Sequence, residues 1–146
     1  MTRICITGGP KTGKTTLSLN MERHSAQPTG PIRHTDDLIG THDWSEASQQ
    51  VSEWLDAPGP WIIEGVAVSR ALRKWRDQHP GEPPPVDRVI YLSEPHEALT
   101  RAQAAMAKGV RKVHDEIEGW LLAAGIDIIG CPRCGLRWSS CRGHAP

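Results

Sequence analysis

The sequence predicts an α/β protein in which helices cover both faces of a mostly parallel, five-stranded sheet. Strand-like apolar segments alternate with helix-like segments along most of the 146 residues, and this alternation is typical of parallel strands joined by crossover helices. The run Trp61-Ile62-Ile63 is apolar without a break, as expected for a central strand buried on both faces. A chain of this length can enclose one sizeable hydrophobic core.

The first strand and the first helix flank a glycine-rich segment. We expect the strand over residues 3–7 and the helix over residues 14–24, with Leu17 and Met21 on the apolar face of the helix. After a loop, a short second strand is predicted over residues 32–35.

The second helix begins after Asp43, with Val51, Trp54 and Leu55 on its apolar face. Asp43 is a suitable N-cap, and Glu46 three residues later fits a capping box. Pro58-Gly59-Pro60 ends this helix, and the third strand is expected over residues 61–65.

The remaining elements continue the alternation. We predict a third helix over residues 67–79, followed by a proline-rich surface connection over residues 79–85 and a fourth strand over residues 88–92. A long fourth helix is expected over residues 95–124, interrupted at Gly109, and a fifth strand over residues 126–129.

The segment Gly8-Gly9-Pro10-Lys11-Thr12-Gly13-Lys14-Thr15 fits the pattern G-x-x-x-x-G-K-[ST] without a mismatch; we call residues 8–15 the glycine loop. Its glycines let the backbone wrap around a phosphate, which successive N–H groups and the helix N-terminus then hold. Lys14 can reach the β- and γ-phosphates, and the Thr15 hydroxyl can ligate Mg²⁺. We therefore expect ATP and Mg²⁺ as ligands, with the choice between ATP and GTP left open. The candidate nucleotide-binding residues are Gly8, Gly9, Lys11, Thr12, Gly13, Lys14, Thr15 and Thr16.

Together these features resemble the P-loop kinases of the nucleoside- and nucleotide-kinase branch, over residues 3–130. The resemblance implies a three-layer fold with strand order 2-3-1-4-5 and a kinase domain over residues 1–130. It also implies an acid after the second strand that orients or deprotonates the acceptor hydroxyl, here Asp36 or Asp37. An acid after the third strand would lie near Mg²⁺, here Glu64.

The same resemblance assigns phosphate-clamping arginines to the helix after the fourth strand. The matching residues are Arg101 and, in a lid-like segment, Arg111. The implied catalytic set is thus Lys14, Asp36, Arg101 and Arg111. Within this branch, the small size and the Thr35-Asp36-Asp37 element are most similar to bacteriophage polynucleotide-type kinases, which include kinases of 5-hydroxymethyluracil in DNA.

Other residues near the expected site remain open. Lys11 either adds charge near the phosphate or points to solvent. Arg70 and Arg73 follow the third strand and either line an acceptor groove or are solvated helix residues. Trp44 lies close in sequence to the expected acceptor loop.

The last residues, 131–146, read C-x₂-C-x₆-C-x₂-H, with Cys131, Cys134, Cys141 and His144 as candidate ligands. Two short knuckles can hold one tetrahedral Zn²⁺ through three cysteines and a histidine. The alternatives are an unordered tail with reduced thiols, or a disulfide. We expect a short zinc-binding tail that follows the kinase domain.

Charge and hydropathy narrow the possible partners. The formal net charge is zero, so no overall field favours nucleic acid or a membrane surface. Locally, residues 101–113 contain four Lys or Arg and no acid, and residues 131–146 contain three Arg and no acid. No apolar run is long enough to span a membrane, and the first residues predict a strand rather than a secretory signal, so we expect a cytoplasmic protein. No motif indicates a protein partner.

These observations predict an ATP-dependent phosphotransferase that acts on a hydroxyl group. The local basic clusters favour an acceptor on DNA or another polynucleotide, either 5-hydroxymethyluracil or a 5′-end. The alternatives are a small-molecule nucleoside or nucleotide kinase, a non-catalytic module whose nucleic-acid binding is gated by nucleotide, and a simple NTPase.

Overall fold

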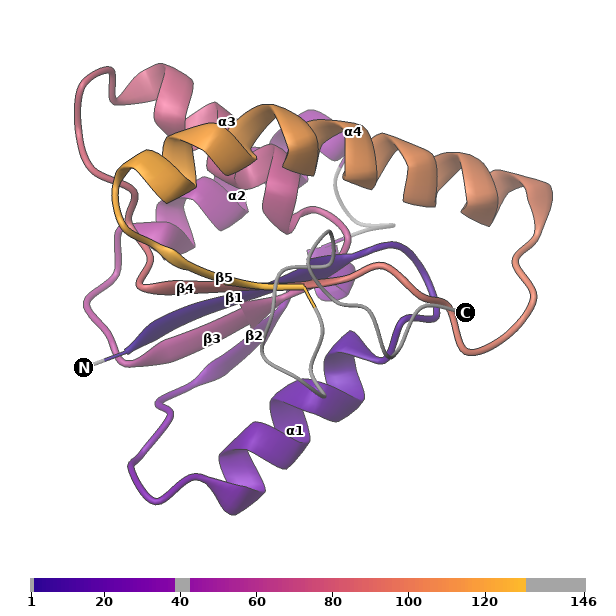
Figure 1. The fold of residues 1–146 in the computed structure, drawn as a ribbon, viewed down its shortest axis with the longest axis horizontal. Coiled ribbons are helices and arrows are strands. Elements are labelled where there is room, and N and C mark those ends of the chain that lie inside the picture. Colours follow the sequence, from indigo (N-terminus) through magenta and orange to yellow (C-terminus); the bar gives the residue numbers. More distant parts are fainter. Residues whose placement is uncertain (1, 39–42, 131–146) are drawn as a thin grey trace.

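Five parallel strands form one sheet in the order β2-β3-β1-β4-β5 (Figure 1). The computed structural model describes residues 2–38 and 43–130; the predicted zinc tail with Cys131, Cys134, Cys141 and His144 lies outside these residues. The strands are β1 (Arg3–Gly8), β2 (Ile32–His34), β3 (Trp61–Glu64), β4 (Arg88–Leu92) and β5 (Asp127–Ile129). The sheet and its strand order confirm the predicted α/β class.

Helices cover both faces of this sheet, as predicted. Helix α1 lies on one face, and α2, α3 and α4 lie on the other (Figure 1). A short 3₁₀ helix, η1, joins β2 to the segment before α2. The bounds are α1 (Lys14–His24), η1 (Thr35–Leu38), α2 (Trp44–Leu55), α3 (Val68–Gln78) and α4 (Arg101–Ala123).

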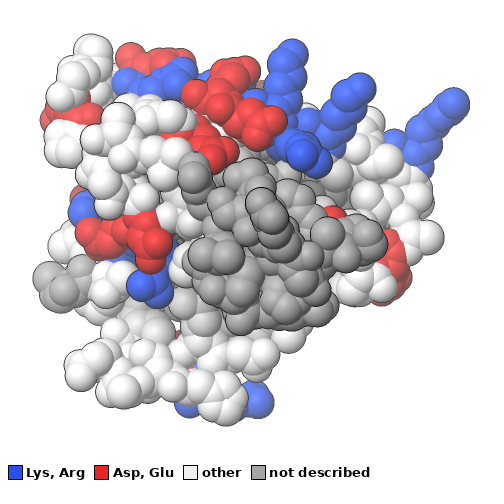
Figure 2. Space-filling model, viewed as in Figure 1, with Lys and Arg blue, Asp and Glu red and all other residues white. Residues whose placement is uncertain are grey.

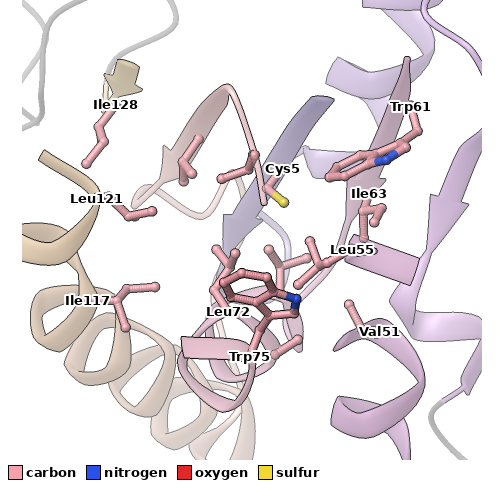
Figure 3. Close-up of a cluster of buried hydrophobic side chains, with 14 residues drawn as sticks. Cys5, Val51, Leu55, Trp61, Ile63, Leu72, Trp75, Ile117, Leu121 and Ile128 are labelled. Carbon is pink, nitrogen blue, oxygen red and sulfur yellow. The ribbon is translucent and has the colours of Figure 1, made fainter. Parts of the chain in front are cut away.

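Alternating side chains of the strands build two separate cores. On the face of the three helices, Cys5 and Ile63 pack with residues of α2, α3 and α4 that include Leu55, Leu72 and Ile117 (Figure 3). On the other face, the partly buried Leu17 and Met21 of α1 pack against a smaller buried cluster, so the predicted apolar face of α1 is confirmed. The buried residues of that cluster are Ile4, Ile6, Ile62, Ile90 and Leu92.

Helix α4 differs from its prediction in two ways. It begins at Arg101 rather than near residue 95, because a capping box fixes its start: the Thr100 hydroxyl accepts from the Gln103 N–H, and the Gln103 side chain accepts from the Thr100 N–H. It also continues through Gly109 without a break. A glycine in a helix costs about 1 kcal/mol relative to alanine, and burial of the apolar face of α4 on the sheet outweighs that cost.

The second strand is also shorter than predicted. It ends at His34, and Thr35, Asp36 and Asp37 belong to η1. At the start of α2, the Asp43 carboxylate accepts from the Glu46 N–H at 2.8 Å, which confirms Asp43 as the N-cap. Within the part of the chain that the structure describes, no helix combines the length and apolarity needed to cross a membrane.

Candidate functional site

The glycine loop leaves the end of β1 and enters α1 in a conformation that depends on its glycines. Gly13 has φ 88° and precedes the first residue of α1 without a side-chain cap, so no capping side chain accepts from the N–H groups of the first turn. Gly9 packs so closely on α4 that an added Cβ would lie 2.6 Å from the Cβ of Ala107. The loop is therefore wedged against α4, with its amide donors free to meet an anion.

Lys14 is buried inside this loop. Only 6% of the residue is exposed, and its Nζ donates to the Gly9 carbonyl at 2.6 Å. Burial lowers the pKa of the Lys14 ammonium, while the carboxylates of Asp36 and Glu64 act in the opposite direction. Lys14 is thus a largely desolvated cation inside the loop, within the field of two carboxylates.

Glu64 ends β3 beside the first turn of α1, with 1% of its surface exposed. The Thr15 hydroxyl donates to Glu64 Oε1 at 3.1 Å, and His34 Nδ1 lies 2.6 Å from the same oxygen. His34 and Glu64 are register partners on neighbouring parallel strands. The second oxygen, Oε2, is buried and has no hydrogen-bond partner in the described residues.

This pair of side chains fits a magnesium ion. Mg²⁺ takes few protein ligands and completes its octahedron with water and substrate phosphate oxygens, so the Thr15 hydroxyl and a carboxylate with one unpartnered buried oxygen are a suitable donor set. In the two described segments, no group of three or more His, Cys, Asp or Glu side chains could hold a metal ion by itself. The predicted zinc ligands fall outside these segments.

A pocket of about 550 Å³ opens over the loop. It brings Lys14, Thr15 and Asp36 together, whereas Asp37 does not line it, although both aspartates are exposed. Of the two candidates that the sequence offered for the acceptor acid, Asp36 lines the pocket and Asp37 does not. The lining residues are Pro10, Lys11, Thr12, Gly13, Lys14, Thr15, Thr16, Asp36, Val66, His96, Gln103 and Met106.

Lys11 links the glycine loop to the connection between β4 and α4. Its Nζ donates to the Ala98 carbonyl at 3.3 Å and lies 3.6 Å from Glu97, and its carbonyl accepts from the His96 N–H at 2.8 Å. The Lys11 side chain thus contacts this connection, although the residue also contributes to the wall of the pocket.

The two arginines assigned to phosphate lie elsewhere on α4. Arg101 and Arg111 are exposed and do not line the pocket; the residues of α4 that face it are Gln103 and Met106. Figure 2 shows Lys and Arg side chains projecting from the N-terminal half of α4, at the upper right, with acidic side chains further along the same helix.

Sequence reasoning missed His34, His96, Gln103 and Met106. His34 carries a readable signal, because it ends a strand whose neighbour in the predicted order ends in Glu64. Gln103 and Met106 depend on the rotational position of α4, which an incorrect helix start obscured. The scan of family models gave no match for this chain, and neither did the search of curated proteins.

Proposed function

We propose that this protein is an ATP-dependent phosphotransferase that moves a γ-phosphoryl group to an acceptor hydroxyl. One observation carries the proposal: residues 10–15 of the glycine loop, including the buried Lys14, and Asp36 line one pocket at the carboxyl edge of the sheet, and Thr15 in this lining donates to the buried Glu64. In open α/β sheets, ligands bind at this edge. A glycine-rich turn without a ligand has no need of a buried lysine or of a buried carboxylate with an unpartnered oxygen.

The residues have complementary roles in the transfer. The acceptor oxygen attacks the γ-phosphorus while the bond from that phosphorus to the β–γ bridging oxygen breaks, so ADP leaves with the electron pair. Asp36 takes the proton of the acceptor hydroxyl. Lys14 and the loop N–H groups stabilise the negative charge on the phosphates. Thr15 and Glu64 would hold Mg²⁺, which supplies further charge neutralisation when bound.

The charge pattern of α4 supports a polynucleotide as the acceptor. Residues 101–112 include four exposed basic side chains and no acid, and residues 115–118 include three acids. The helix dipole favours the opposite arrangement, with acids near the N-terminus, so helix stability does not account for this pattern. An exposed basic stripe is suited to a phosphate backbone. The basic residues are Arg101, Lys108, Arg111 and Lys112.

The decisive test is transfer of label from γ-labelled ATP to a panel of acceptors. The panel comprises single-stranded DNA with a 5′-hydroxyl, DNA that contains 5-hydroxymethyluracil, RNA, free nucleosides and nucleotides. We expect label on a polynucleotide, a steep fall of acceptor affinity with salt, and a loss of at least about 100-fold in Lys14→Ala.

Two of the rival functions predict different results in this assay. Efficient labelling of a free nucleoside, with none on DNA or RNA, would identify a small-molecule kinase. Nucleotide-gated binding of DNA without transfer would identify a non-catalytic module. Transfer at the wild-type rate by Lys14→Ala would contradict the proposed role of the glycine loop.

A further inference from the structure

An exposed tryptophan and an arginine lie against each other at the N-terminal ends of α2 and α3. Trp44 is the first residue of α2, and 40% of its surface is exposed. The Arg70 guanidinium carbon lies 5.1 Å from the centroid of the Trp44 ring. Among the described residues, the other exposed large hydrophobic side chains are Leu19 and Leu122, so Trp44 is the one exposed large aromatic. The fold does not need this ring for its core.

Arg70 forms no ion pair with any of the described residues. In the part of the chain that the structure describes, no carboxylate lies within ion-pair distance of its guanidinium, whereas Arg73 on the same helix pairs with Glu116 at 3.2 Å. Arg70 extends toward α4, where a Cβ added to Gly109 would lie 2.9 Å from its Nη2. The guanidinium is thus held between an indole ring and a glycine, with its fork of N–H donors available for an anion.

The pair lies at the carboxyl edge of the sheet, although neither residue lines the pocket, because Arg70 is in the first turn of α3, the helix that follows β3. Val66, which lines the pocket, lies in the turn that leads from β3 into α3. Asp36, the proposed acceptor acid, lies in η1, which packs against α2, the helix that Trp44 begins. Trp44 and Arg70 therefore lie at the same edge of the sheet as the glycine loop and Asp36.

We propose that Trp44 and Arg70 form an acceptor subsite for one nucleotide unit of a single-stranded polynucleotide. The base stacks on the exposed indole, and the adjacent phosphate accepts hydrogen bonds from the Arg70 guanidinium. As an acceptor site, this subsite rests on the proposed phosphotransferase function, but binding to it can be measured without any transfer.

The chemistry of the pair selects this ligand class. Aromatic side chains provide stacking platforms for unpaired bases of any sequence, and the planar guanidinium matches the geometry of a phosphate group. An uncharged sugar or a free nucleoside would leave the guanidinium without an anion. A base within a duplex presents its edges rather than its faces, so the subsite requires a single strand or an extruded base.

The chain contains a matched control for this pair. The Arg33 guanidinium carbon lies 5.5 Å from the centroid of the Trp54 ring, which makes the same kind of contact. Arg33 is an exposed residue of β2, and Trp54 is partly buried against the larger core, so its ring is less available for stacking than that of Trp44. Arg33→Gln therefore removes the same charge and the same kind of contact at a different place.

The experiment uses the full chain and a single-stranded DNA oligonucleotide that contains 2-aminopurine, a base whose fluorescence falls on stacking. We expect wild-type protein to bind the oligonucleotide and quench it. Trp44→Ala should weaken binding by roughly 5- to 150-fold and abolish the quenching, and Trp44→Phe should restore most of both. Arg70→Gln should weaken binding and lower the slope of log affinity against log salt by about one. Arg33→Gln should change neither.

The outcomes separate this inference from the proposed function. Wild-type affinity and quenching in both Trp44→Ala and Arg70→Gln would overturn the subsite, and so would an equal loss in Arg33→Gln. If the expected binding pattern appears without any transfer from γ-labelled ATP, the subsite stands and the phosphotransferase proposal fails. If label reaches DNA equally well with wild type and both variants, the phosphotransferase stands and the subsite fails.

Discussion

The carboxylate of Glu64 is held by one of its two oxygens. Thr15 and His34 both contact Oε1, and Oε2 lies buried without a partner in the described residues. A buried unpaired oxygen of this kind is costly, and such costs are typical of sites that are completed by a ligand. We therefore interpret the unpartnered oxygen as a position reserved for the proposed cation or for its bound water.

A comparison of two neighbouring aspartates tests the assignment of the acceptor acid. Asp36 lines the pocket and acts on the pKa of Lys14, while Asp37 does not line it. Asp36→Asn should lower kcat by about 100- to 10,000-fold, because the acceptor hydroxyl loses its base, and ATP affinity should stay the same. Steady-state transfer from γ-labelled ATP to the acceptor measures kcat, and equilibrium binding of ATP without acceptor measures the affinity.

Asp37→Asn is the control for this comparison, since it removes the same charge one residue away. It should keep kcat within about threefold of wild type, in line with the small effect of most surface substitutions. Equal losses in the two variants would indicate that net charge, rather than a positioned base, matters in η1.

At the residue scale, the sequence was sufficient to locate those candidate residues whose position depends on a local motif or on the end of one strand. The motif located Lys14 and Thr15, and the end of an apolar strand located Glu64, because strand ends and loop motifs can be read without knowing the tertiary structure. His34 acquires its position only from the pairing of β2 with β3. Arg101 and Arg111 were assigned by resemblance alone, and the structure places both outside the pocket lining.

At the scale of one element, α4 joins the proposed nucleotide pocket to the hydrophobic core. Its first half faces the glycine loop through Gln103 and Met106, and its second half buries Ile117 and Leu121 on the sheet. The start of this helix was mispredicted because an apolar period alone does not reveal the Thr100–Gln103 capping box. Its continuity through Gly109 reflects tertiary packing, which local propensity cannot show.

Helix α4 also contains a buried histidine that makes stability depend on pH. His114 packs edge-on against Tyr91, with a ring centroid distance of 4.3 Å, its Nε2 lies 3.9 Å from Glu118, and its Nδ1 is buried without a partner in the described residues. Burial lowers the pKa of His114 from 6.5 to about 4, although the carboxylate of Asp115 acts to raise it. Unfolded His114 therefore binds a proton at a higher pH than folded His114 does.

The consequence is a loss of stability in acid. Because the unfolded chain gains the proton first, the free energy of unfolding should fall as the pH drops from 6.5 to 4, by up to about 3 kcal/mol from this group. Urea titrations at a series of pH values measure the slope. His114→Gln should flatten it over this range, and an unchanged slope in that variant would show that other groups cause the loss.

At the scale of the whole molecule, the strand order assembles the site. β1 and β3 are adjacent although residues 15 and 64 are far apart in sequence, so the glycine loop and Glu64 meet at one edge. Alternation of strands and helices was sufficient to predict a parallel sheet with helices on both faces. The particular order 2-3-1-4-5 came from the family resemblance, because hydrophobic pattern does not determine which parallel strands are neighbours.

The predicted zinc tail is best tested on the complete chain. Protein purified without chelator should contain about one zinc per chain, because Cys131, Cys134, Cys141 and His144 provide a tetrahedral donor set. Elemental analysis by mass spectrometry measures the ratio. The double variant Cys131→Ser and Cys134→Ser should lose the metal and should bind the polynucleotide acceptor more weakly, with ATP affinity retained.

Two findings would contradict the zinc prediction. One is the absence of zinc from protein prepared in this way. The other is a disulfide between Cys131 and Cys134 under reducing conditions, which would occupy two of the four ligands.

The burial of Lys14 implies that the thermal stability of the fold and the proposed binding of phosphate make opposite demands on this residue. The ammonium is already stripped of most of its water in the folded chain, and its lowered pKa reflects that unfavourable environment. Lys14→Met keeps the length of the side chain but removes the charge, so it should raise the free energy of unfolding by about 1 kcal/mol, or roughly 3–5 °C in Tm. The same variant should no longer bind ATP.

Scanning calorimetry of the two proteins without nucleotide measures the difference in Tm. A lower Tm in Lys14→Met would show that the bond from Lys14 to the Gly9 carbonyl stabilises the fold more than desolvation of the ammonium weakens it. If Tm rises instead, as we expect, the lysine proposed to bind phosphate lowers the resistance of the fold to heat.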